Sequence, residues 1–143
     1  MRLDIVTPER LIYSGIVDVV VVPGVIGEMS ILPNHCPLMT LLRCGELRIR
    51  KGGEEIAVAI GGGFLEVRSD RIVVLADLAE RDDEIDARKV EEAKLLAEQS
   101  LSKRKTTIKD KAEMEAALRF ELTRLKIAER HKKKKSTARS EKI

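Results

Sequence analysis

The sequence predicts a mixed fold, in which a β-sandwich or flattened barrel is followed by an antiparallel two-helix hairpin. All nine glycines and all four prolines lie at or before Gly63, so the last 80 residues contain no helix-breaking residue. Near this point the hydrophobic period changes from about two, typical of strands, to about 3.6, typical of helices. We therefore expect a β domain in residues 1–84, a helical hairpin in residues 85–130 and a disordered basic tail in residues 131–143.

Short apolar or alternating segments separated by turn residues predict the strands of the β domain. The alternation is clean in residues 46–50, where Leu47 and Ile49 are expected to face the core. Gly52-Gly53 and Ser69-Asp70 predict hairpin turns, the first because glycine accepts a positive φ. The predicted strand segments are 3–7, 11–13, 17–22, 28–31, 38–42, 46–50, 54–60, 64–68 and 71–75.

Two stretches of the β domain stand out from ordinary turns. The segment 24–37 contains two prolines, which cannot donate ladder hydrogen bonds and hold a loop stiffly extended. It is either a contact surface carrying Glu28 and His35 or only the corner where the chain passes between sheets. Residues 61–63 are three glycines without the Lys-Ser/Thr and following helix of a phosphate-binding loop. They predict a bulge or a close backbone approach instead.

The last 60 residues predict two helices. Asp83 and Asp86 are candidate N-caps for a first helix over residues 86–103, and Thr107 with Asp110 approximates a capping box for a second. Much of the apolar surface is alanine, which buries little area, so the pair should depend on docking to the sandwich or to a partner. The connection 102–107 lacks Gly and Pro, so a partner could draw the helices apart or extend them. The predicted apolar stripes are Val90, Ala93, Ala97 and Leu101, then Ala112, Ala116, Phe120, Thr123 and Ile127.

Charge is distributed unevenly along the chain. Residues 1–84 carry nine basic and fourteen acidic groups, a net charge of −5, whereas residues 85–143 carry eighteen and ten, a net charge of +8. The two parts are expected to attract each other. The tail 131–143 has six Lys or Arg against one Glu and is either solvated or attracted to an anionic membrane surface or nucleic acid. With aromatic residues at 2%, a base-stacking surface for single-stranded nucleic acid cannot be assembled.

The residue types needed for catalysis or metal binding are scarce. His35 and His131 are the only histidines, and Cys36 and Cys44 have no second ligand pair at zinc-site spacing. His35 and Cys36 are neighbours, and an extended loop would point their side chains apart. We expect a non-enzyme with free thiols, in a reducing compartment. The longest apolar run, 19–23, is too short to span a bilayer.

Residues 27–38 fit the pattern Gly-Glu-x-x-Ile-x-Pro-x-His-x-Pro-Leu of a known protein family. Residues 62–67 and 74–77 fit its later strand motifs, and Ile85-Asp86 fits its helix start. With these motifs in the same order, the chain resembles the epsilon subunits of F-type, rotary proton-translocating ATP synthases over roughly residues 1–130.

The resemblance implies a ten-stranded β-sandwich and two antiparallel helices in the central rotor stalk, a non-catalytic subunit that couples proton flow to ATP synthesis. The implied partners are the gamma subunit and the c-subunit ring, and the implied location is peripheral, on the cytoplasmic face of an energy-coupling membrane such as a bacterial plasma membrane. The residues implied at the c ring are Glu28, Met29 and Ser30, and those near gamma are His35, Leu38 and Thr40.

In bacterial members of this family the helices extend along gamma to the alpha and beta catalytic subunits and inhibit ATP hydrolysis. Some members also bind ATP through an Ile/Leu-Asp-x-x-Arg-Ala motif, a preceding glutamate and two arginines four residues apart. In this sequence Lys89 replaces the motif arginine and Val90 the alanine, and the two arginines are five apart, so we expect weak or absent ATP binding and no cofactor. The corresponding positions are Glu80, Asp86, Lys89, Arg119 and Arg124.

Two other functions stay open on residues alone. The chain could be a stand-alone ATP-sensing module, or a basic-tailed adaptor that binds nucleic acid or a membrane surface. The resemblance favours the rotor subunit, and it implies that nucleic acid is not among the partners.

Overall fold

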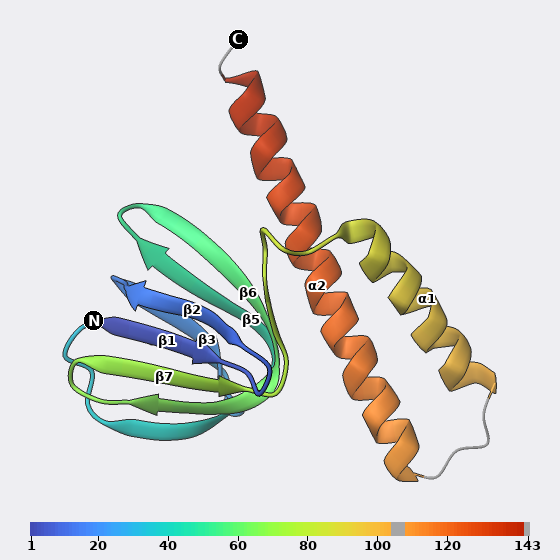
Figure 1. Cartoon of the computed structure of the whole chain (residues 1–143), viewed down its shortest axis with the longest axis horizontal. Helices are drawn as coiled ribbons and strands as arrows, with labels where there is room; N and C mark the ends of the chain where they lie inside the picture. The colour runs from blue at the N-terminus through green and yellow to red at the C-terminus, as the bar shows by residue number, and fades with distance from the viewer. Residues whose placement is uncertain (104–107, 142–143) are drawn as a thin grey trace.

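The computed structural model describes residues 1–103 and 108–141, in which a β domain is followed by two helices. Figure 1 shows the β domain as a sandwich with both helices on one side, where α2 lies between the sandwich and α1. This order of elements confirms the predicted fold class. The elements are β1 (Arg2–Val6), β2 (Leu11–Ile16), β3 (Val19–Pro23), β4 (Glu28–Ile31), β5 (Leu38–Lys51), β6 (Glu54–Val67), β7 (Arg71–Ala76), β8 (Ala79–Arg81), α1 (Ala87–Lys103) and α2 (Ile108–Ser140).

Two long strands, β5 and β6, pass through both layers of the sandwich. One layer, here called layer A, contains β2, β1, β7, the second half of β6 and the first half of β5. The other, layer B, contains β8, the first half of β6, the second half of β5, β3 and β4. β1 and β7 pair in parallel, and the other paired strands are antiparallel.

The expectation of ten strands is corrected to eight in the described residues. The segments predicted at 38–42 and 46–50 form one strand, β5, and those at 54–60 and 64–68 form another, β6. Pairing continues across both bends, from Leu42 opposite Gly63 to Cys44 opposite Gly61. If the two halves of β5 and of β6 are counted separately, the β domain has ten strand segments. Nine of these correspond to predicted segments, and the tenth is β8, which was not predicted.

The three glycines allow β6 to bend and to approach β7 closely, as the sequence predicted. Gly62 and Gly63 have φ angles of 104° and 147°. A Cβ atom on Gly63 would lie 2.1 Å from the carbonyl oxygen of Leu75 on β7. No side chain fits at this distance, so glycine is required for the close approach of the two backbones.

Both predicted hairpin turns are present. Gly52 and Gly53 have φ angles of 56° and 82°, as a type I′ turn requires. The amide of Arg68 donates to the carbonyl of Arg71 at 2.8 Å across the last hairpin. Between the layers, alternate strand residues form a fully apolar core, whose largest buried side chains include Leu3, Ile5, Ile31, Leu47, Ile49, Ile60, Leu65 and Ile72.

The first helix begins as predicted. The Asp86 carboxylate accepts a hydrogen bond from the amide of Arg88 at 3.0 Å, which makes Asp86 the N-cap of α1. Val90 is fully buried and Ala93 and Ala97 are half-buried, in agreement with the predicted stripe. The proposed capping box at Thr107 lies outside the described residues.

The second helix is longer and less completely docked than expected. It continues to Ser140, so the prediction of a disordered tail from residue 131 is wrong for residues 131–140. Of its predicted stripe, Phe120 and Ile127 are buried, but Ala112 and Ala116 are exposed. Figure 1 shows the reason: the first turns of α2 extend past one edge of the sandwich, the middle turns lie beside it, and the last turns extend beyond the other edge. In the described part of the chain, neither helix combines the length and the apolar character needed to cross a membrane.

Candidate functional site

A small apolar interface joins α2 to the outer face of layer B. Side chains alternate between the two faces of β6. Val58 and Ile60 lie in the sandwich core, so Ala57 and Ala59 point outward. Phe120 and Ile127 of α2 pack against these two alanines, and Ile85 and Cys44 line the edge of the contact. Small residues on the strand let the helix approach closely but limit the apolar area that is buried.

A thiol lies at this interface. The Sγ atom of Cys44 on β5 is 4.0 Å from the hydroxyl oxygen of Thr123 on α2. Burial under the helix raises the pKa of the Cys44 thiol, although Thr123 and the charge of Arg119 act in the opposite direction. Both cysteines are free, as the sequence predicted.

Charged groups surround the apolar contact. Arg124 of α2 pairs with Glu80 of β8, with 2.5 Å between Nε and Oε2, and with Glu121 one helical turn earlier at 2.6 Å. Its guanidinium also lies 5.7 Å from the centre of the Phe120 ring. The attraction expected between the acidic β domain and the basic helices is therefore realised where α2 crosses layer B.

The residues implied in ATP binding are only partly brought together. Glu80 and Arg124 are in contact, but Asp86 caps α1 and Lys89 is exposed on the next turn. Arg119 lines a different cleft, beside Cys44 and Lys126. In this arrangement Arg124 forms ion pairs with the carboxylates of Glu80 and Glu121.

The outer face of layer A carries exposed apolar side chains in one row. Leu41 on β5, Phe64 on β6 and Leu75 on β7 are direct neighbours across the three strands, and each is about half exposed. Met39 lies two residues before Leu41 on the same face and is 71% exposed. The sequence did not predict this surface, here called the layer A stripe, because only Met39 and Leu41 lie in the run 38–42, whereas the other two side chains come from β6 and β7.

The residues implied at the gamma subunit lie beside this stripe but mostly face elsewhere. Leu38 packs against the sandwich core, and Thr40 shares its inward face by the alternation of the strand. His35 is half-buried in the turn that leads from β4 to β5. Its Nδ1 lies 3.9 Å from Cys36 Sγ, so the expectation that these two side chains point apart is wrong. The reason is a tight turn with Asn34 at φ 65°, where an extended loop was expected.

The residues implied at the c ring lie on β4, an edge strand of layer B. Glu28 is exposed and accepts a hydrogen bond from Arg48 at 2.7 Å, and Ser30 is exposed beside it. Met29 packs against the core. The segment 24–37 thus contains a hairpin, an edge strand and a corner between the layers, in agreement with the second interpretation, and the contact surface stays a prediction.

Comparison with known proteins places both parts of the chain in one family. The family model for the β-sandwich domain of the ATP synthase delta/epsilon chain matches residues 1–82, and that for its long α-helix domain matches residues 83–129. An ATP synthase epsilon chain of Dehalococcoides mccartyi is 53% identical over 133 residues, covering 93% of this chain and 95% of its own length. The epsilon chain of Desulforamulus reducens is 50% identical over 128 residues, which are 90% and 96% of the two chains.

Solved structures agree on the fold. A chain in the mitochondrial ATP synthase of Euglena gracilis superimposes with a TM-score of 0.69 at 24% identity, covering 83% of this chain and 76% of its own. A chain from the central stalk and c ring of the Tetrahymena thermophila enzyme gives 0.62 at 14% identity, covering 89% and 95%. With its sandwich and its helices both matched, the chain belongs to the delta/epsilon-chain family of ATP synthase subunits.

Proposed function

We propose that this chain is the epsilon-type rotor subunit of a proton-translocating ATP synthase, a non-catalytic subunit that couples proton flow to ATP synthesis. Its sandwich binds the gamma subunit and rests on the c-subunit ring, at the cytoplasmic face of a bacterial membrane. Family membership across both domains supports this function over a free ATP sensor or a basic adaptor.

The observation that carries the proposal is the contrast between the two outer faces of the sandwich. α2 covers layer B through Ala57 and Ala59, whereas the layer A stripe has no cover in the described residues. An exposed row of apolar side chains in strand register is typical of a protein interface. We assign the stripe to gamma, with His35 at its margin, and the edge strand at Glu28 and Ser30 to the polar loops of the c ring.

The helices form a movable regulatory arm. Their apolar contact with the sandwich is small, and α1 packs mainly on α2. An arm held by few contacts can leave the sandwich when a partner offers better ones. In the released state the basic helices engage acidic surfaces of the catalytic subunits and inhibit ATP hydrolysis.

Substitution of Phe64 tests the gamma assignment. Phe64→Asp places a charge in the centre of the stripe and should weaken gamma binding about 100-fold, while the thermal unfolding of the isolated chain changes little. Leu95→Asp on α1 is the matched control, because Leu95 is 54% exposed and Phe64 is 53% exposed. The control should bind gamma normally. Equal binding by both variants would contradict the assignment of the stripe.

A further inference from the structure

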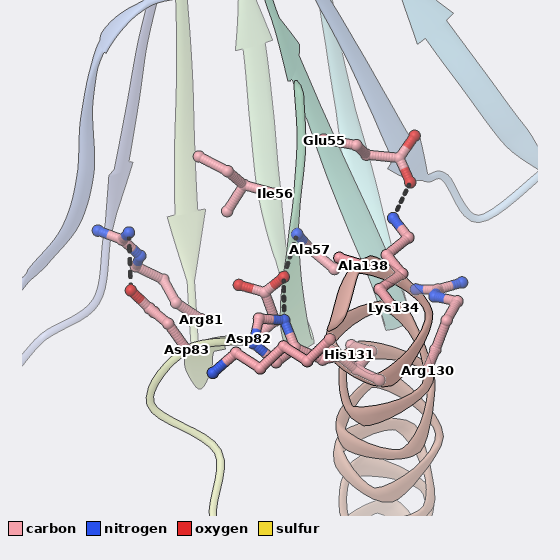
Figure 2. Close-up of a pocket in the computed structure, with 12 residues that line it drawn as sticks. Glu55, Ile56, Ala57, Arg81, Asp82, Asp83, Arg130, His131, Lys134 and Ala138 are labelled. Atoms are coloured by element: carbon pink, nitrogen blue, oxygen red, sulfur yellow. Dashed lines mark hydrogen bonds and ion pairs between the residues drawn. The ribbon is translucent and has the colours of Figure 1, made fainter. Parts of the chain in front are cut away.

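Where its last three turns begin, α2 meets the sandwich through three basic side chains, Arg130, His131 and Lys134. Residues 130–140 lie beyond the region matched by the helical family model, which ends at residue 129. Figure 2 shows the side chains of Arg130, His131 and Lys134 at the end of the sandwich, opposite acidic groups. Every residue after His131 in this helix is exposed, so apolar burial does not hold it there.

Three side-chain contacts connect this part of the helix to the sandwich: two Lys or Arg ion pairs and one contact between a histidine and a carboxylate. Arg130 pairs with Glu46 of β5. His131 Nδ1 lies 3.5 Å from Asp82 Oδ2, just after β8, and Lys134 Nζ lies 4.0 Å from Glu55 Oε1 of β6. The three acids come from different strands, while the three bases occupy one face of α2.

The acidic partners are built into the sandwich. Asp82 also accepts a hydrogen bond from the amide of Ala57 at 3.3 Å, which fixes the carboxylate toward α2. Burial opposes the charge of Glu55, but the hydrogen bond from Arg50 and the nearby charge of Lys134 keep the pKa of the Glu55 carboxyl below its ordinary value. The groups line a cleft of about 350 Å³ between helix and sheet.

We propose that Arg130, His131 and Lys134 form an ion-pair latch that holds the helical arm against the sandwich. Because the apolar interface beside it is small, the latch contributes a measurable share of the free energy that keeps the arm docked. Exposed or partly exposed ion pairs are weakened by salt and by competing acidic surfaces. An acidic protein surface that binds these three bases therefore releases the arm from the sandwich.

The native cysteine provides a reporter for docking. In a full-length Cys36→Ser, Thr123→Cys chain, Cys44 and the new thiol face each other only when α2 is docked. The chain is equilibrated in buffers of reduced and oxidised glutathione, and the fraction that holds a disulfide between the two thiols is measured. This fraction gives the effective concentration of the two thiols, which rises with the fraction of chains in which α2 is docked. The latch variant is Arg130→Gln, His131→Gln, Lys134→Gln, and its matched control is Lys132→Gln, Lys133→Gln, Arg139→Gln, at exposed positions on the same helix.

The latch variant should lower the effective concentration about tenfold, and the control should stay within about twofold of the parent. A salt concentration of about 1 M, where the screening length falls to about 3 Å, should lower the parent's value more than the latch variant's, because the variant lacks the three basic side chains but keeps the Arg124–Glu80 pair. Asp82→Asn with Glu55→Gln, on the sandwich side, should reproduce the loss without altering the helix. A latch variant equal to the control, or a parent insensitive to salt, would overturn the proposal.

Discussion

Arg124 on α2 and Glu80 on β8 form an ion pair that joins the helical arm to the sandwich, with 2.5 Å between Nε and Oε2. Both side chains are largely buried, and Arg124 is held by Glu121 as well. These residues stand at positions implied in nucleotide binding, yet here they pair with each other. A phosphate would have to displace two carboxylates to reach Arg124.

ATP is therefore expected to bind weakly or not at all. Lys89 lacks the planar guanidinium that can bind a phosphate through two hydrogen bonds, and its side chain is exposed. Calorimetric titration of the isolated chain should give no measurable heat at micromolar nucleotide. Micromolar affinity would contradict this prediction, and its loss in Glu80→Ala would then locate the site.

Phe120→Ala should undock the arm and leave the sandwich intact. Phe120 supplies most of the bulk in the contact with Ala57 and Ala59, and its removal should cost about 3 kcal/mol, which corresponds to about a 100-fold change in docking. The labelling rate of Cys44 by a thiol reagent, in a Cys36→Ser background, measures this opening. Leu122→Ala, at an exposed position two residues later, is the control and should label at the parent rate.

Gly63→Ala should unfold the sandwich at a much lower temperature. The added Cβ meets the Leu75 carbonyl at 2.1 Å, so β6 and β7 must separate, at a cost of about 3 kcal/mol and a fall in Tm of about 15 °C. Gly52→Asn makes a fair comparison, because that turn has open space and asparagine tolerates its φ of 56°. Thermal unfolding of the two variants should differ clearly, and similar Tm values would refute the close-approach argument.

The buried carboxylate of Asp4 makes stability depend on pH. A hydrogen bond from Ser14 at 2.6 Å lowers the Asp4 pKa most; burial opposes it, and Arg71 and Arg2 lower it further. Because the pKa is depressed in the folded state, this stabilisation is present above the unfolded value of about 3.9 and is lost as the pH falls through the folded value. Denaturant unfolding should show Asp4→Asn less stable by about 2 kcal/mol at neutral pH. The difference in unfolding free energy between Asp4→Asn and the parent should disappear in acid. A difference that increases in acid would contradict this prediction.

The sequence predicted the fold well where local signals and tertiary contacts agree. The glycine pair at 52–53 and the N-cap at Asp86 are set by φ angles and hydrogen bonds within a few residues, and both were placed correctly. The predicted break within β6 was wrong because three successive glycines suggest an interruption, whereas here they let one strand bend while pairing continues.

The candidate surfaces were harder to predict, since they depend on contacts distant in sequence. The basic segment 131–143 has the composition of a disordered tail. The helix continues into it, however, where basic side chains at residues 130–134 contact three carboxylates that are distant in sequence, Glu46, Glu55 and Asp82. The layer A stripe needs the register of three strands before Leu41, Phe64 and Leu75 become neighbours. Residue spacing alone does not contain that register.

The central claim is that the arm must leave the sandwich to inhibit ATP hydrolysis, and a reversible lock tests it directly. In the Cys36→Ser, Thr123→Cys chain, a disulfide between Cys44 and the introduced thiol holds α2 on layer B in the assembled enzyme. The rate of ATP hydrolysis should rise when this disulfide forms and return to the inhibited level when it is reduced, while the Cys36→Ser chain alone shows no change. Hydrolysis that is equally inhibited with the arm locked and unlocked would contradict the account.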